Sequence, residues 1–281
     1  MDLQRMSSKK VQVGNIECGS DDLFVISGPC VIEDEKTMMK TAEMLKEVSE
    51  RLKFPVIYKS SFTKDNRSTA DNYRGPGLEE GLKMLQKVKD EFNFPLISDV
   101  HYPEQVEAAA EVLDVIQIPA YLVMQTTLVQ AAARTEKPIN LKHAQFLAPE
   151  NMALPAGKCE AVGNDQLILT ERGYAFGYND LVVDPRSFYL MRKLGYPVVF
   201  DVTHSVRKYG IPSADPKGGN REFLPTLARA GAAAGVDGFF IETHPEPEKA
   251  LCDAASQLCV YDFEEFMKPI LELHAAEVKW R

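Results

Sequence analysis

The chain has 281 residues, of which 45% are hydrophobic, and a formal net charge of -9. This size and composition suffice for a full hydrophobic core, while the acidic balance offers no broad positive face to a nucleic-acid backbone. The sequence has no apolar run of about 18 residues or more, and its first residues lack the hydrophobic segment of an export signal. We therefore expect a soluble, cytoplasmic protein that binds small molecules and has neither nucleic acid nor membrane as a partner.

Eight short apolar runs rich in β-branched residues alternate with helical patterns along the chain. The runs are nearly continuous in hydrophobicity, which is typical of strands buried on both faces of a parallel sheet. They cover residues 23–27, 55–59, 95–99, 114–118, 138–142, 166–170, 197–201 and 238–242, with helical patterns at 35–52, 77–92, 103–113, 128–136 and 222–235. This alternation, without any linker, predicts a single domain, 1–281, with the (β/α)₈ TIM-barrel fold.

Two terminal segments lie outside this repeat. Residues 1–22 are predicted to be an N-terminal extension, in which 11–17 forms a small hairpin over the bottom of the barrel. Residues 261–281 are predicted to be a C-terminal helix packed against the barrel wall.

Cations follow several of the predicted strands, at the end of a barrel where catalytic groups usually lie. Lys59 and Lys142 emerge from buried strands and Arg172 follows another, and a buried cation is costly unless it meets an anion. A structural salt bridge would explain one lysine, but three converging cations favour a phosphate or carboxylate site. A class I aldolase, which needs a desolvated lysine for its Schiff base, is an alternative, although neighbouring charged cations form imines poorly.

Cys30, His204, Glu242 and Asp253 form a second group of reactive residues. The five cysteines of the chain are odd in number and scattered, which favours free thiols or a metal ligand over a disulfide framework. Thiolate, imidazole and carboxylates together suit a transition-type divalent ion better than magnesium. No CxxC or HExxH pattern is present, and each residue also has an ordinary structural explanation, so spacing alone leaves both hypotheses open.

Long motifs in this chain resemble the 3-deoxy-D-manno-octulosonate 8-phosphate synthase family. They include GPCVIE (28–33), KSSFTKDNRS (59–68), YRGPGLEEG (73–81), NLKHAQFLAP (140–149), LTERGYAFGYNDLVVD (169–184), FDVTHSV (200–206) and ETHPEPEKALCDAASQL (242–258). The resemblance runs from residue 23 to residue 260. It implies a (β/α)₈ barrel, usually a homotetramer, that condenses phosphoenolpyruvate with arabinose 5-phosphate and releases inorganic phosphate.

The resemblance also implies roles for individual residues. Metal-dependent members of the family have the cysteine of GPC where metal-independent members have asparagine, so Cys30 implies a divalent ion such as Zn²⁺, Fe²⁺ or Mn²⁺. The other implied metal ligands are His204, Glu242 and Asp253. The implied catalytic residues are Lys59, Asn66, Lys142 and His204, and the implied substrate-binding residues are Lys59, Lys64, Asn66, Arg67, Ser68, Gln117, Lys142, Phe146 and Arg172.

Several positions depart from the family pattern where the sugar phosphate would bind. Met124 replaces the usual arginine, Thr127 lies in the same altered segment, His143 replaces a lysine and Asp65 replaces an alanine. An alternative function is therefore that of a sister synthase, which condenses phosphoenolpyruvate with another aldose. A non-enzymatic barrel is a third possibility, but all the proposed metal ligands and phosphoenolpyruvate cations are present, which argues against it.

Overall fold

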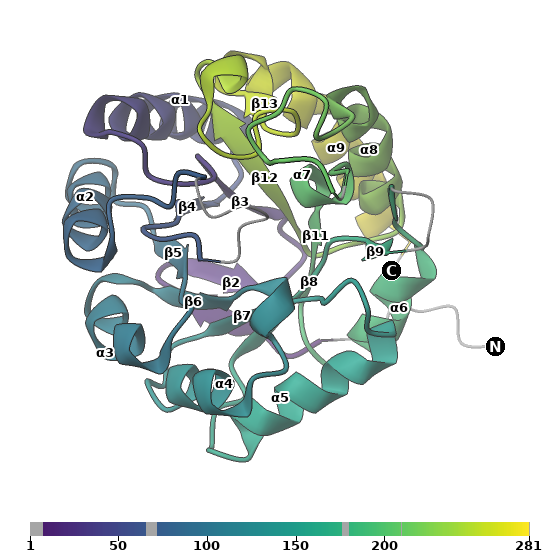
Figure 1. Ribbon diagram of the computed structural model, residues 1–281. Coiled ribbons are helices and arrows are strands. Elements are labelled where there is room, and N and C mark those ends of the chain that lie inside the picture. Colours follow the sequence, from purple (N-terminus) through teal and green to yellow (C-terminus); the bar gives the residue numbers. More distant parts are fainter. Residues whose placement is uncertain (1–7, 66–71, 176–179, 209, 281) are drawn as a thin grey trace.

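Parallel strands form a closed barrel with helices on its outer face (Figure 1). The computed structural model describes residues 8–65, 72–175, 180–208 and 210–280. In order around the ring, the barrel strands are β3 (Phe24–Gly28), β4 (Val56–Lys59), β5 (Leu96–Asp99), β6 (Val115–Ile118), β7 (Ile139–Lys142), β8 (Leu167–Glu171), β11 (Val198–Asp201) and β12 (Gly238–His244). Each strand pairs in parallel with its neighbour, and β12 pairs with both β11 and β3, which closes the ring. The predicted (β/α)₈ fold is confirmed.

The predicted helices lie outside the barrel, and the structure adds shorter ones. Two of the added helices, α5 and α6, have eight and seven residues, and α5 contains Pro155 and Gly157, so neither gives a strong helical pattern. The helices are α1 (Glu35–Leu52), α2 (Leu78–Phe92), α3 (Pro103–Val112), α4 (Thr126–Ala133), α5 (Ala153–Glu160), α6 (Arg186–Arg192), α7 (Val202–Ser205), α8 (Leu224–Ala233) and α9 (Phe263–Val278). Short 3₁₀ helices are η1 (Ala120–Leu122), η2 (Pro149–Met152), η3 (Arg221–Phe223), η4 (Pro247–Lys249) and η5 (Val260–Asp262).

The C-terminal helix α9 packs against α8 and α1. Within the described residues, we find no helix whose length and apolar character would suit a bilayer crossing.

The predicted hairpin is present and covers one end of the barrel. Strands β1 (Val11–Val13) and β2 (Ile16–Cys18) pair antiparallel. Their buried side chains join the same apolar cluster as barrel residues such as Phe24, Ile57 and Val199. The hairpin therefore closes the amino-terminal end of the barrel. Three short strands were not predicted, namely β9 (Tyr174–Ala175), β10 (Leu181–Val182) and β13 (Leu258–Cys259).

The interior of the barrel changes from apolar to polar along the strands. Side chains two residues apart in a strand point to the same face. On β4 the buried apolar cluster at the hairpin end includes Ile57, and the buried polar residue two positions later is Lys59. The same step occurs at Ile97 to Asp99, Val115 to Gln117, Ile168 to Thr170, Val199 to Asp201 and Phe240 to Glu242. The polar side chains therefore gather at the carboxyl end, opposite the hairpin.

Candidate active site

Lys59 lies at the end of β4 and is almost fully buried, with 1% of its surface exposed. Its Nζ donates hydrogen bonds to the carbonyl oxygen of Cys30 at 2.9 Å and to Oε1 of Glu242 at 2.8 Å. Gly28 permits this arrangement, because its φ is +149° and a Cβ there would lie 2.1 Å from the carbonyl oxygen of Lys59. The strand β3 can therefore pass close to β4 and direct Cys30 toward the same charged cluster.

Lys142, at the end of β7, shares a carboxylate with a histidine. It donates to Oδ2 of Asp201, and its Nζ lies 3.6 Å from the centre of the Phe240 ring. Burial lowers the pKa of Lys142 to about 8, although Asp201 raises it, and the charge of Arg172 lowers it further. Burial opposes ionisation of Asp201, but His204 and Lys142 outweigh this effect and hold its pKa below the ordinary value. Asp201 therefore stays ionised at mildly alkaline pH, whereas Lys142 loses its proton more readily than an ordinary lysine.

A row of hydrogen bonds crosses the barrel mouth from β5 to β8. The Nζ of Lys64 donates to Oδ2 of Asp99 at 2.7 Å, and Nε2 of Gln117 donates to the other oxygen of the same carboxylate. Asn140 Nδ2 donates to Oε1 of Gln117 at 2.7 Å, and Thr170 Oγ1 donates to Oδ1 of Asn140 at 2.6 Å. Every side chain in this row is buried, so the row fixes the orientation of both amides.

The four predicted metal ligands lie together, and Asp253 connects them. Its Oδ2 is 3.4 Å from Nε2 of His204 and 3.2 Å from Sγ of Cys30. Glu242 approaches the same ring nitrogen of His204, with Oε1 at 3.8 Å. Asp201 lies 2.7 Å from the opposite nitrogen, Nδ1, and thus directs Nε2 toward the carboxylates. Metal-binding histidines are commonly oriented by a carboxylate in this way.

The charge and hydrogen bonding of this cluster fit a divalent cation. Oε2 of Glu242 is buried and makes no hydrogen bond within the described part of the chain, so it has a lone pair to offer. Burial opposes protonation of His204, but the charges of Asp201 and Glu242 outweigh it and raise the pKa of the imidazole. The potential at this point therefore favours positive charge. Thiol, imidazole and carboxylate donors together suit ions such as Zn²⁺ or Fe²⁺.

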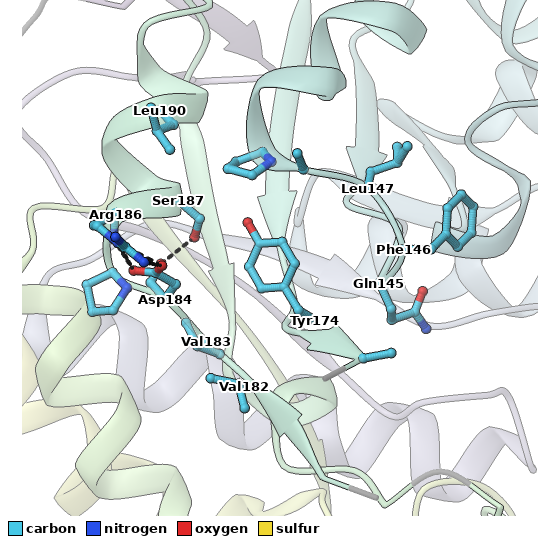
Figure 2. A pocket seen from close by; sticks show the side chains of 14 residues that line it. Gln145, Phe146, Leu147, Tyr174, Val182, Val183, Asp184, Arg186, Ser187 and Leu190 are labelled. Carbon is cyan, nitrogen blue, oxygen red and sulfur yellow. Dashed lines mark hydrogen bonds and ion pairs between the residues drawn. The ribbon is translucent and has the colours of Figure 1, made fainter. Parts of the chain in front are cut away.

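Of the other predicted site residues, one is buried at the end of a barrel strand, one lines another pocket and three lie outside the described residues. Arg172 follows β8 and its side chain is buried, with 5% exposed. Phe146 is 63% exposed and lines a separate pocket of about 790 Å³ that contains none of the predicted lysines. Figure 2 shows Tyr174 between Phe146 on one side of this pocket and the Asp184–Arg186 ion pair on the other. The remaining predicted contacts, Asn66, Arg67 and Ser68, lie outside the described residues.

The structure shows how the departures on the acceptor side are accommodated. The carboxylate of Asp65 forms an ion pair with Arg74, so its negative charge is matched locally. The side chain of Met124 packs against the hydrophobic core. His143 is buried, with Nδ1 3.3 Å from the carboxylate of Glu171. Each of these three substitutions thus has its own contacts within the chain.

Two residues of the cluster escaped the sequence prediction as site residues. Cys252 Sγ lies 2.6 Å from Sγ of Cys30, and Arg207 forms an ion pair with Asp253. The available signals were that Cys252 directly precedes a predicted ligand and that Arg207 follows His204 by three positions. Neither signal was specific for a site residue, since the sequence alone does not show which loop residues reach the carboxyl end of the barrel.

The closed parallel barrel, with buried cations at its carboxyl end beside a thiol, imidazole and carboxylate cluster, defines a TIM-barrel enzyme for small anionic substrates. A family model described as the DAHP synthetase I family matches residues 5–277, and the chain belongs to this family. It is 50% identical over 268 residues to a 2-dehydro-3-deoxyphosphooctonate aldolase of Geotalea uraniireducens, covering 95% of this chain and 98% of the relative. It is 49% identical over 254 residues to a protein of the same name from Desulfatibacillum aliphaticivorans, covering 90% and 93%.

Proposed function

We propose that this chain condenses phosphoenolpyruvate with arabinose 5-phosphate and water to give 3-deoxy-D-manno-octulosonate 8-phosphate and inorganic phosphate, and that it requires a divalent metal ion. The name of its relatives, 2-dehydro-3-deoxyphosphooctonate aldolase, describes the same product. The relatives therefore favour this acceptor over the alternative of a sister synthase that uses another aldose.

The observation that carries the proposal is the group of buried cations beside the candidate metal ligands. Phosphoenolpyruvate carries a carboxylate and a phosphate, and a phosphate monoester alone carries about -1.5 to -2 charges at pH 7. Lys59, Lys64 and Lys142 are each paired with a carboxylate, so they do not by themselves give the pocket excess positive charge. Arg172 is buried at the same end of the barrel and offers a guanidinium fork that suits paired oxygens, and a divalent ion would add positive charge that helps to hold this substrate.

The proposed reaction forms one carbon–carbon bond and one carbon–oxygen bond, the latter to water, and breaks the carbon–oxygen bond to phosphate. C3 of phosphoenolpyruvate attacks the aldehyde carbon of the sugar, water adds at C2, and the resulting hemiketal phosphate releases inorganic phosphate. Lys142 and Arg172 would hold the anionic groups while charge moves between carboxylate, phosphate and new alkoxide. Asp201 keeps Lys142 and His204 in place through its two contacts. When bound, the metal ion would supply Lewis-acid chemistry toward the water or the aldehyde oxygen.

Phosphate release from phosphoenolpyruvate tests the proposal directly. Metal-stripped protein is assayed with and without added Zn²⁺ or Mn²⁺, against arabinose 5-phosphate, erythrose 4-phosphate, ribose 5-phosphate and free arabinose. We expect metal-dependent turnover with arabinose 5-phosphate. Turnover with another aldose alone would contradict the proposed acceptor, and equal rates in metal-stripped and metal-loaded protein would contradict the metal requirement. Borohydride should trap no substrate, because no Schiff base forms in this reaction.

We also propose that the chain assembles as a homotetramer, as its family resemblance implies. The pocket in Figure 2 is bordered by exposed apolar side chains, with Phe146 at 63% and Val182 at 44%, and Tyr189 nearby on α6 is 59% exposed. Apolar side chains grouped in this way are common where another subunit packs. Light scattering that gave the mass of a monomer at micromolar concentration would contradict this assembly.

A further inference from the structure

Two cysteines from distant parts of the chain meet at the candidate metal site. Cys30 follows β3 and Cys252 lies in the loop between β12 and β13, and their Sγ atoms are 2.6 Å apart. Both side chains are buried, with at most 1% of either residue exposed. Cys30 Sγ is also 3.2 Å from Oδ2 of Asp253, so both sulfurs lie beside a predicted metal ligand. Ligand atoms of Cys30, Cys252 and Asp253 all fall within 4.8 Å of one another.

The backbone around the two cysteines holds them in this position. The side chain of Gln257 bridges them, since its Oε1 accepts from the N–H of Cys30 at 3.2 Å and its Nε2 donates to the carbonyl of Cys252 at 2.8 Å. Asp253 adopts a φ of +49°, which is uncommon for a residue other than glycine. In an extended chain neighbouring side chains point to opposite sides, but here Cys252 and Asp253 both contact the sulfur of Cys30. The loop is thus shaped to bring both groups to one point.

The charges around the cluster would balance if a second thiolate were present beside the divalent ion. Cys30 as thiolate, Glu242 and Asp253 together with a second thiolate would carry four negative charges. Lys59 contacts Glu242 and Arg207 contacts Asp253, so these two cations and a divalent ion balance all four. With only one thiolate the same buried group would keep an excess positive charge. A buried cluster is more stable when its charges are matched.

We infer that Cys252 provides a second thiolate ligand to the divalent ion, an inference that rests on the proposed metal site. With bonds of about 2.3 Å, two thiolates on one zinc ion are roughly 3.3 to 3.8 Å apart, whether the ion has five or four ligands, so the two sulfurs separate by about 1 Å when the ion enters. A donor set with two sulfurs favours Zn²⁺ or Fe²⁺ over Mn²⁺, which prefers oxygen ligands. The four ligands Cys30, His204, Glu242 and Asp253 alone would suit Zn²⁺, Fe²⁺ or Mn²⁺. A further thiolate from Cys252 would make Mn²⁺ the least favoured of these ions.

X-ray absorption at the zinc edge counts the sulfur neighbours of the bound ion without any need for activity. Protein is reduced, stripped of metal and loaded with one equivalent of Zn²⁺. We expect two sulfurs in the wild type and one in each of the variants Cys252→Ser and Cys30→Ser. The matched control is Cys259→Ser in β13, which removes a half-buried thiol whose sulfur lies 3.8 Å from the carbonyl oxygen of Pro245, and which should leave the count at two.

The wild-type spectrum decides the matter even if a variant fails to fold. One sulfur in zinc-loaded wild type would overturn the second thiolate while leaving the proposed metal site intact. Absence of bound zinc in the wild type would overturn both. A second readout is the thiolate-to-cobalt charge-transfer absorption of the Co²⁺-loaded protein, which should fall by about half in Cys252→Ser if two thiolates bind the ion. An unchanged band in that variant would also overturn the inference.

Discussion

Lys142 is expected to make phosphoenolpyruvate binding sensitive to mildly alkaline pH. Its pKa is lowered to about 8, because burial disfavours the ammonium form and the charge of Arg172 adds to this effect, while Asp201 only partly compensates. The charged lysine, which binds an anion, therefore predominates below pH 8 and is lost above it. At pH 9 about a tenth of the molecules retain the charge, so kcat/KM for phosphoenolpyruvate should be about a tenth of its value at pH 7.

The assay is phosphate release from pH 6.5 to 10 at saturating arabinose 5-phosphate and constant free metal. The substrate cannot produce the change itself, since the second pKa of a phosphate monoester is about 6 and lies below this range. Lys64 cannot produce it either: burial lowers its pKa, but Asp99 outweighs burial and raises the pKa well above the ordinary value. Bound substrate stabilises the charged lysine, so the decline in kcat should occur at higher pH than the decline in kcat/KM.

The matched control is Lys142→Arg, whose guanidinium keeps its charge throughout this range. Calorimetric titration with phosphoenolpyruvate gives the affinity even if this variant turns over slowly. Affinity of the variant should be constant from pH 7.5 to 9.5, whereas that of the wild type falls. A wild-type kcat/KM that stays constant to pH 9.5 would refute the reasoning from burial.

Two further substitutions test the supports of the site. Asp201→Asn should weaken Zn²⁺ binding by about 10-fold to 100-fold, because His204 loses the carboxylate that directs Nε2 to the metal ligands; a metal titration that matched the wild type would argue against that role. Gly28→Ala should lower the free energy of unfolding in urea by at least about 3 kcal/mol, because its Cβ would lie 2.1 Å from the carbonyl oxygen of Lys59. The control Gly77→Ala has a φ of +93° but no atom within 4 Å of its Cβ, so it should cost only the backbone strain of about 1 to 3 kcal/mol, without the added clash of Gly28→Ala. Equal losses in the two glycine variants would mean that the close contact is relieved by a small shift of β3.

The barrel was predictable because its strands are buried on both faces. A run such as 238–242 is apolar at every position before its terminal glutamate, and the strand β12 begins at the predicted residue. Helix α1 matches its predicted bounds because its apolar residues recur at three and four over 18 residues, which gives a strong signal. The two-residue strands β9 and β10 are too short to give any periodicity, so only the fold reveals them.

The site was predictable in its strand-borne parts and less so in its loops. The barrel fixes where each strand ends, so Lys59 and Lys142 could be placed at the mouth once the strands were recognised. Their carboxylate partners come from other strands, and which lysine meets which carboxylate depends on how the ring closes. Cys252 lies in a loop whose path is set by Gln257 and by the φ of Asp253, and a sequence pattern does not encode such a path.

Glu242 links the candidate metal cluster to the cations that would hold the substrate. Its Oε1 accepts from Lys59, while its Oε2 has no hydrogen-bond partner in the described chain and the same carboxylate approaches His204. A divalent ion bound to Glu242 would weaken the ion pair between Glu242 and Lys59. The charge of Lys59 would then attract an anionic ligand more strongly. The two events would then favour each other, and linkage requires the effect to be mutual: phosphoenolpyruvate would strengthen metal binding by the same factor by which metal strengthens phosphoenolpyruvate binding. A pocket in which Lys59, Lys64 and Lys142 each have a carboxylate partner would gain affinity for an anion through this kind of exchange, because the candidate metal ligand Glu242 is also the partner of Lys59.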